Sequence, residues 1–222
     1  MVHVRPATTD DIAAAADLFA RAFEHDPVWV ALMPRTRHRA RTIRWIMHAD
    51  LAGPGPRPLD VAVDENGRVV GALRWSAPRI EQGPTPWWRR QAARIGWALG
   101  NLLGGSLGRG LQQERAVRAH RPREPHWYLQ DVAADPERQG QGIGSALLRY
   151  RLAQIDQAGA PAALEATTTG SARLYARHGF VTVATVNLLP GAQSQVMLRP
   201  AADRAENAQL SATAEAVGDG PA

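Results

Sequence analysis

A glycine-rich turn joins an apolar strand to an amphipathic helix in residues 132–148, whose sequence is VAADPERQGQGIGSALL. Gly140, Gly142 and Gly144 fall where the loop becomes the helix, which we expect over 143–157. A helix N-terminus presents unpaired backbone N–H groups and about half a positive charge, so it binds anions without any side chain. Because glycine lets the backbone approach a ligand closely, the stretch predicts a diphosphate site.

Two other interpretations of the glycines compete with a diphosphate site. A tight turn followed by close helix packing also needs glycine. A dinucleotide-binding fold is disfavoured, because the spacing is G-x-G-x-G rather than G-x-G-x-x-G, lies late in the chain, and is not followed by a strand ending in an acidic residue. A Walker A loop is excluded, because all 26 basic residues are arginine and that loop needs lysine.

Short strands and helices alternate on both sides of this turn. We expect strands over 3–5, 59–63, 68–76, 127–133, 163–167, 180–188 and 195–199. We expect helices after Thr8 as N-cap, over 36–51, over 143–157, and over 171–178 with Gly179 as the cap. Asn66-Gly67 predicts a hairpin, because it favours the positive φ angles of a tight turn. The order predicts an α/β protein with a mixed (α+β) sheet flanked by helices.

A single domain and a tail account for the 222 residues. We expect the domain over 1–200, with an insertion at 84–125 that has its own helix over 87–103, broken by the glycines at 104–105 and 108–110. The insertion carries a tryptophan and arginine cluster, for which packing, an acceptor wall or lid, and a membrane-surface helix are the alternatives. Residues 201–222 are small and polar, which predicts disorder.

Composition restricts both the chemistry and the location. The sequence has no cysteine, which removes disulfides, thiolate metal sites and a covalent thioester on the enzyme, so a transfer reaction has to be direct. The seven histidines show no paired ligand spacing, so we expect no metal. The sequence shows no apolar run of about 18 residues and no secretory leader, so we expect no membrane span and a cytoplasmic location.

The net charge of +5 is concentrated in one segment. Residues 87–123 hold eight arginines and one acid, Glu114, so the rest of the chain sums to −2. A local basic segment suits a phosphate-bearing ligand, an acidic partner or a membrane surface as well as it suits nucleic acid. Because the positive charge is local and the rest of the chain is slightly acidic, the charge distribution argues against nucleic acid, and we expect no nucleic-acid partner.

Residues 132–148 resemble the acetyl-CoA motif of the GNAT superfamily of N-acetyltransferases, whose core is Arg/Gln-x-x-Gly-x-Gly/Ala. Gln139, Gly142 and Gly144 fill its fixed positions, and residues 174–180 (LYARHGF) resemble the second motif of that family. The element order matches over about 2–199, although only 127–180 is specific. The resemblance implies a central, mostly antiparallel sheet whose fourth and fifth strands splay apart, with the pantetheine arm of acetyl-CoA lying between them like an added strand.

The same resemblance assigns residues to acetyl-CoA as cosubstrate. It implies that the backbone of Val132, Ala133 and Ala134 contacts the acyl and pantetheine portion. The pyrophosphate would lie on Gln139, Gly140, Gln141, Gly142, Ile143 and Gly144. Several relatives have an asparagine after the fifth strand, where this chain has three threonines; Thr168 or Ser171 is expected to replace that contact.

Acetyl transfer to an amine needs a neutral amine, an oxyanion donor and a proton for the leaving thiolate. By resemblance Tyr175 is the general acid; the alternative is a packed tyrosine between helix and sheet. Glu165 lies in an apolar strand, where a carboxylate is costly unless it is used or paired. It is therefore either the general base or a salt-bridged glutamate, and Asp131 and His126 are the competing bases.

The expected function is acetylation of a primary amine on a small molecule. We expect the acceptor pocket at about 23–33 and in the insertion, where Glu24 and Asp26 either attract a cationic amine or lie at a solvated helix end. The alternatives are a protein or peptide N-acetyltransferase and a non-catalytic CoA-binding regulatory protein. The sequence leaves the acceptor and the oligomeric state open, a homodimer being one option.

Overall fold

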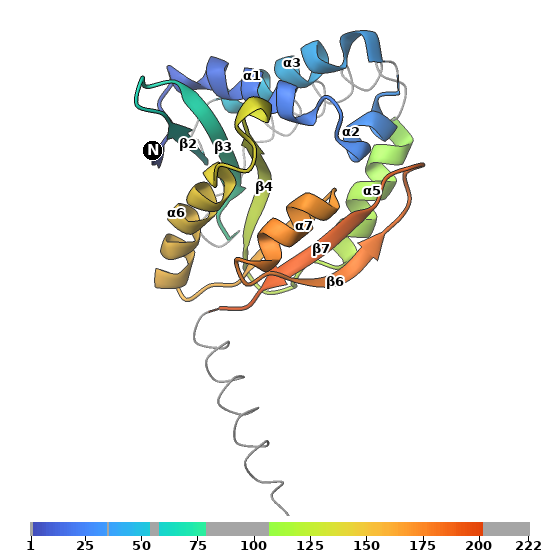
Figure 1. Ribbon diagram of the computed structural model, residues 1–222. Helices are drawn as coiled ribbons and strands as arrows, with labels where there is room; N and C mark the ends of the chain where they lie inside the picture. The colour runs from blue at the N-terminus through green and yellow to red at the C-terminus, as the bar shows by residue number, and fades with distance from the viewer. Residues whose placement is uncertain (1, 35, 54–57, 79–106, 202–222) are drawn as a thin grey trace, which may run out of the picture.

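A seven-stranded sheet forms the centre of the protein in the computed structural model, which describes residues 2–34, 36–53, 58–78 and 107–201 (Figure 1). The strands stand in the order β1-β2-β3-β4-β5-β7-β6. Only β4 and β5 pair in parallel, so the predicted mixed, mostly antiparallel sheet is confirmed. The strands are β1 (His3–Pro6), β2 (Leu59–Val63), β3 (Val69–Ser76), β4 (Trp127–Ala134), β5 (Ala162–Ala166), β6 (Val181–Val186) and β7 (Ser194–Arg199).

The predicted hairpin joins β2 and β3 in antiparallel register. Gly67 has a φ of 75°, which a residue with a side chain rarely adopts. The side chain of Asp64 closes the turn, since its Oδ1 accepts hydrogen bonds from the backbone N–H groups of Asn66 and Arg68, each at 3.0 Å. Local sequence therefore determines this turn and the strand pairing that follows from it.

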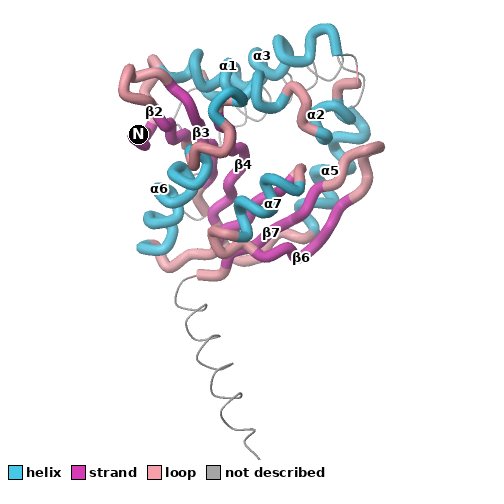
Figure 2. The backbone as a smooth tube through the Cα atoms, viewed as in Figure 1, coloured by secondary structure: helices cyan, strands magenta, loops and turns pink. Residues whose placement is uncertain are grey.

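The two halves of the sheet separate beyond the first part of β4. Strands β4 and β5 pair at three positions, from Trp127 opposite Ala162 to Leu129 opposite Leu164. Beyond them β4 continues along β3 as far as Ala134, whereas the end of β5 pairs with β7. The strands of Figure 2 diverge accordingly, with β2–β4 in one group and β6–β7 in the other. The splayed fourth and fifth strands are thus confirmed.

Helices cover both faces of the sheet (Figure 1). One face packs against α1 and α3, through Phe19 and Ile43. The other packs against α6 and α7, whose Leu147, Leu148 and Tyr175 belong to a second core cluster. The helices are α1 (Asp11–Phe23), α2 (Pro27–Leu32), α3 (Arg39–Leu51), α5 (Leu107–Ala119), α6 (Ile143–Gln157) and α7 (Thr169–Ala176), and the 3-10 turns are η1 (Thr36–His38) and η2 (Pro136–Arg138).

One prediction about the first helices is wrong, and one helix was not predicted. Thr8 is not an N-cap: the cap of α1 is Asp10, and the Thr8 hydroxyl donates to Asp11 Oδ2 at 2.9 Å. The chain also forms α2 directly after Asp26, whose side chain accepts from Val28 N and Trp29 N. Asp-Pro is a usual helix start, because aspartate caps the first N–H groups and proline fits the first helical position. That signal was present in the sequence and could have located α2.

The expected insertion falls partly within the described residues. The helix predicted over 87–103 lies outside them, as does the tail predicted over 201–222 except for its first residue, Ala201, which is buried. The glycine break predicted at 108–110 is wrong, because these residues form the first turn of α5. This helix packs on the outer half of the sheet, where Val117 meets Val186 and Val196 and where Gln113 Nε2 donates to Ser194 Oγ at 2.9 Å.

Candidate active site

The glycine turn lies between β4 and α6 and has the geometry of an anion site. Gly140 and Gly142 have φ angles of 80° and 79°, and Gly142 is the N-cap of α6. The first intrahelical hydrogen bond runs from Ala146 N to Gly142 O at 2.9 Å. The N–H groups of Ile143, Gly144 and Ser145 precede that bond, so they are free to bind a ligand at this helix end.

Gly144 has a different role from the other two glycines. A Cβ atom at position 144 would lie 3.1 Å from Leu174 Cδ2, whereas Cβ atoms at 140 and 142 would meet nothing within 4 Å. Gly144 therefore allows α6 to pack closely on α7, and Gly140 and Gly142 supply the backbone angles of the loop. Close packing therefore applies to Gly144, and the phosphate site at Gly140 and Gly142 stays a prediction.

A buried carboxylate anchors the loop to the rest of the fold. Asp135 is 1% exposed and accepts from both terminal nitrogens of Arg21 on α1, from Arg68 at 3.5 Å, and from the N–H of Glu137 at 3.3 Å. Burial favours a higher pKa for Asp135, but the hydrogen bonds from Arg21 and Glu137 N outweigh it and lower the pKa below its ordinary value. Sequence reasoning missed this anchor, although Asp-Pro again indicated a cap.

The β4 edge beyond the splay is open toward β5. Val132, Ala133 and Ala134 pair on one side with Leu73, Ala72 and Gly71 of β3, and the β4–β5 register holds no partner for them on the other side. The register of β3 and β4 shifts between Arg74 and Trp75, which leaves Gln130 as a bulge. An extended ligand can therefore lie along this edge and use the backbone groups of β4.

Tyr175 lies on α7, which follows β5 in the chain, and belongs to the second core cluster. The residue is 6% exposed, its ring meets Phe180 edge-on, and its hydroxyl makes no hydrogen bond to any described residue. Burial raises the pKa of the phenol above its ordinary value, and the charges of Asp131 and Asp26 raise that pKa further. The phenol is therefore protonated over the physiological range and has a proton to give.

Glu165 forms a salt bridge with Arg121, which is one of the two roles that the sequence left open for it. Its Oε1 accepts from the Tyr128 hydroxyl at 2.6 Å and from Arg121 Nη2 at 3.2 Å. The Arg121 guanidinium also stacks on the Tyr128 ring, 3.7 Å from its centroid. Burial raises the pKa of Glu165 above its ordinary value, while the bonds from Tyr128 and Arg121 oppose that rise. Tyr128 and Arg121 were not among the predicted site residues, and no sequence pattern links them to Glu165.

The competing bases have other partners. Asp131 accepts from Arg74 Nε at 2.6 Å, and Arg74 also pairs with Asp50. His126 Nδ1 lies 2.9 Å from the carbonyl oxygen of Glu124, close to it in the chain. Asp131 is thus bound to a residue of β3, and His126 contacts a residue of the loop before β4.

Thr168 and Ser171 form a capping box at the start of α7. Ser171 N donates to Thr168 Oγ1 at 3.1 Å, and Thr168 N donates to Ser171 Oγ at 3.2 Å. Both side chains are thus used locally to satisfy the first N–H groups of the helix. Their predicted contact with the pantetheine arm stays a prediction.

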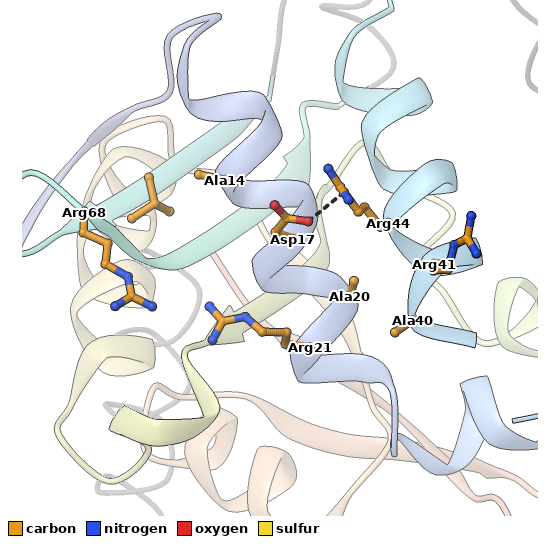
Figure 3. Close-up of a pocket in the computed structure, with 9 residues that line it drawn as sticks. Ala14, Asp17, Ala20, Arg21, Ala40, Arg41, Arg44 and Arg68 are labelled. Carbon is orange, nitrogen blue, oxygen red and sulfur yellow. Dashed lines mark ion pairs between the residues drawn. The ribbon is translucent and has the colours of Figure 1, made fainter. Parts of the chain in front are cut away.

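A hollow of about 570 Å³ lies outside the splay, on the outer surface between α1, α3 and the start of β3 (Figure 3). Arg21, Arg41, Arg44 and Arg68 line it, and Arg44 pairs with Asp17 at 2.7 Å. The hollow contains none of the predicted site residues. Arg21 and Arg68 line the hollow and also bind Asp135, which precedes the glycine turn. The hollow therefore lies next to that turn.

The described residues contain neither a membrane-spanning helix nor a metal-binding cluster. No helix there is both long and apolar enough to cross a membrane. Within the same ranges, no three His, Asp or Glu side chains lie together in an arrangement that would hold a metal ion.

Solved structures with this architecture include enzymes with different acceptors. A Corynebacterium glutamicum protein described as histone acetyltransferase HPA2 and related acetyltransferase shares 28% identity over 90% of this chain and 97% of its own, with a TM-score of 0.68. A Drosophila melanogaster polyamine N-acetyltransferase shares 16% over 89% and 99%, at 0.55. The Escherichia coli ribosomal-protein-S18-alanine N-acetyltransferase shares 15% over 90% and 94%, at 0.52. The last two similarities show a common fold alone.

The model of the acetyltransferase (GNAT) family matches residues 15–180, which is well over half of the chain. The matched range includes the glycine turn, the splayed strands and Tyr175. This chain belongs to the acetyltransferase (GNAT) family.

Proposed function

We propose that this protein transfers an acetyl group from acetyl-CoA directly to a primary amine of a small-molecule acceptor. The observation that carries the proposal is the combination of an open β4 edge with a helix N-terminus at its end. A thioester with a long amide-containing arm and a diphosphate needs those two features in that order. Direct transfer fits a sequence without cysteine, because the protein has no thiol to carry the acyl group.

The residues present fit acetyl-CoA. The free N–H groups of Ile143 and Gly144, with the positive-φ backbone of Gly140 and Gly142, suit the pyrophosphate. The flanking Gln139 and Gln141 are exposed at the same loop. Val132, Ala133 and Ala134 offer backbone groups to the pantetheine amides, and Thr168 and Ser171 stand at the start of α7 across the opening.

Acid and base roles follow from the surroundings of the titratable groups. Tyr175 donates the proton that the leaving thiolate takes up, since burial and two nearby carboxylates keep its phenol protonated. Glu165 is the proposed base, because burial raises its pKa toward the range where a carboxylate accepts protons readily. Asp131 is the alternative base, although its carboxylate is already ion-paired with Arg74.

The test is a panel of primary amines with acetyl-CoA, followed by release of free thiol and by mass spectrometry of the acceptor. Amide formation on at least one small amine supports the proposal. If no amine releases CoA above the hydrolysis background while CoA still raises the melting temperature, the protein binds the cosubstrate without small-molecule turnover.

A protein or peptide acceptor is the second candidate. It is favoured by the name of the Corynebacterium glutamicum relative, which refers to a histone acetyltransferase, at 28% identity. The same assay with basic peptides distinguishes the two, because a peptide enzyme would acetylate peptides and leave small amines unchanged.

A further inference from the structure

The corner between α1 and α2 meets the open end of β5. Asp26 Oδ1 accepts from Val28 N at 2.9 Å and from Trp29 N at 3.2 Å, which caps α2. Its other oxygen, Oδ2, accepts from the Thr167 hydroxyl at 2.5 Å. Thr167 directly follows β5, at the side of the splay opposite β4. One carboxylate thus joins the corner between α1 and α2, where the sequence predicts the acceptor pocket, to the end of β5 at the opening between the strands.

Asp26 differs from Asp131 and Glu165 because those two carboxylates each have an arginine partner. Asp131 pairs with Arg74 at 2.5 Å, and Glu165 pairs with Arg121 at 3.2 Å. Asp26 is half-buried and has no arginine or histidine partner among the residues that the structure describes. A carboxylate removed from water is costly unless a cation compensates it, so a cation at this position would be stabilised.

A second polar group, the Tyr175 hydroxyl, has no hydrogen-bond partner among the described residues. The Tyr175 side chain is 6% exposed, and its hydroxyl donates to no described residue. Thr167 directly precedes Thr168, the N-cap of α7, so its hydrogen bond with Asp26 places the carboxylate at the start of the helix that carries this phenol. An amine that enters the opening between the strands would meet a hydroxyl without a described partner and a carboxylate without a described cation.

We propose that Asp26 binds the acceptor's ammonium group and so selects amines that arrive as cations. The inference rests on the proposed function, because it names the class of acceptor for the same site. The Phe23 and Trp29 rings stack at 6.3 Å in the same corner, and aromatic faces attract ammonium groups and apolar chains alike. Asp26 is a binding residue here, and the acetyl transfer itself is left to the groups around Tyr175.

Binding of charge-matched ligand pairs tests the role of Asp26 without turnover. The probes are 2-phenylethylamine against 2-phenylethanol, and butylamine against butan-1-ol, each pair nearly equal in shape and different in charge. Calorimetric titrations are run on the full chain with and without saturating CoA. We expect the ammonium member of at least one pair to bind ten times more tightly than its alcohol.

The variant Asp26→Asn removes the charge and keeps the fold, because the asparagine Oδ1 caps a helix as well as aspartate does and its Nδ2 can donate to the Thr167 hydroxyl oxygen. We expect it to weaken ammonium binding about tenfold, to leave alcohol binding unchanged, and to raise KM for amines and not for acetyl-CoA. Glu24→Gln is the matched control, since it removes an equal charge two residues away, and it should behave as the unmodified chain.

Each outcome decides the proposal. Equal affinity of amine and alcohol in both pairs, no binding of any probe, or an equal effect of Asp26→Asn and Glu24→Gln would overturn it. Failure of the proposed function looks different: ammonium binding would depend on Asp26 while no amine is acetylated. A peptide enzyme would show the same Asp26 dependence with lysine-containing peptides.

Discussion

Arg21 on α1 and Asp135 before the glycine turn form a two-point ion pair across 114 residues, with nitrogen to oxygen distances of 3.0 and 3.3 Å. The carboxylate is 1% exposed, and it also holds the N–H of Glu137. The first helix therefore fixes the position of the loop that we propose as the pyrophosphate site.

Replacing Asp135 tests this anchor. Asp135→Asn presents an amide to two guanidinium groups, which should cost about 1–3 kcal/mol of unfolding free energy and weaken CoA binding severalfold. Urea unfolding and calorimetric titration with CoA measure the two effects. Asp17→Asn is the control, because its partner Arg44 is 59% exposed and such surface pairs contribute about 0–1 kcal/mol. Equal losses in both variants would contradict the anchoring role.

The backbone angle of Gly142 gives a second prediction. Gly142→Ala places a residue with a side chain at a φ of 79°, which should cost about 1–2 kcal/mol, and the loop should bind CoA less well. No clash contributes, since a Cβ there meets nothing within 4 Å. Gly170→Ala is the comparison: it lies in the first turn of α7 with an ordinary contact of 3.8 Å, and it should be neutral or slightly stabilising. Thermal melts of both variants, with and without CoA, distinguish the loss of stability from the loss of CoA binding.

Removal of the Tyr175 hydroxyl should affect turnover and not stability. Tyr175→Phe leaves no described group without a hydrogen-bond partner, because the hydroxyl makes no such bond. We expect kcat to fall by about 10²–10⁴-fold, with both KM values and the melting temperature nearly unchanged. Steady-state kinetics with the best amine from the panel provide the measurement. An unchanged kcat would assign the proton transfer to another group or to water.

Replacing Glu165 should lower the stability of the fold, because its carboxylate accepts hydrogen bonds from both Tyr128 and Arg121. Glu165→Gln leaves Arg121, whose side chain is 14% exposed, with Glu114 at 3.7 Å as its remaining described ion pair. We expect a loss of about 2–3 kcal/mol in urea unfolding, because breaking a buried pair leaves an uncompensated charge. Tyr128→Phe keeps the ring under Arg121 and removes one hydrogen bond, so it should cost about 1 kcal/mol. A larger loss for Tyr128→Phe would show that the ion pair contributes little.

Acid stability should depend on Asp11. Hydrogen bonding by Arg5, at 2.6 Å, lowers the pKa of Asp11 to about 2. Because the folded pKa lies below the unfolded value of about 3.9, the stabilisation is complete above that value and is lost as pH falls through about 2. Its size should be about 1–2 kcal/mol, since Arg5 is 33% exposed and partly screened. Urea midpoints from pH 6 to 2 should show the gap between the unmodified chain and Asp11→Asn closing on acidification; a constant gap would contradict this assignment.

The sequence determined the features that depend on neighbouring residues. Alternating apolar positions indicated six of the strands within one residue of their ends, Asn66-Gly67 indicated the hairpin, and Gly140 and Gly142 indicated a glycine turn at the start of α6. Each of these follows from backbone angles, helix end groups or side-chain periodicity, which are local properties. The last residues of the strand expected over 180–188 lie beyond β6, which ends at Val186.

Only the tertiary structure decided which side chains share the site. Asp26 meets Thr167 across 141 residues, and Tyr128 meets Glu165 across 37. Such contacts depend on strand register, on the bulge at Gln130 and on where the two halves of the sheet part, and no local pattern encodes these. For that reason the sequence could offer Glu165 as either a base or a salt-bridged residue, whereas the fold supplied its partners and left Asp26 as the carboxylate without a described cation.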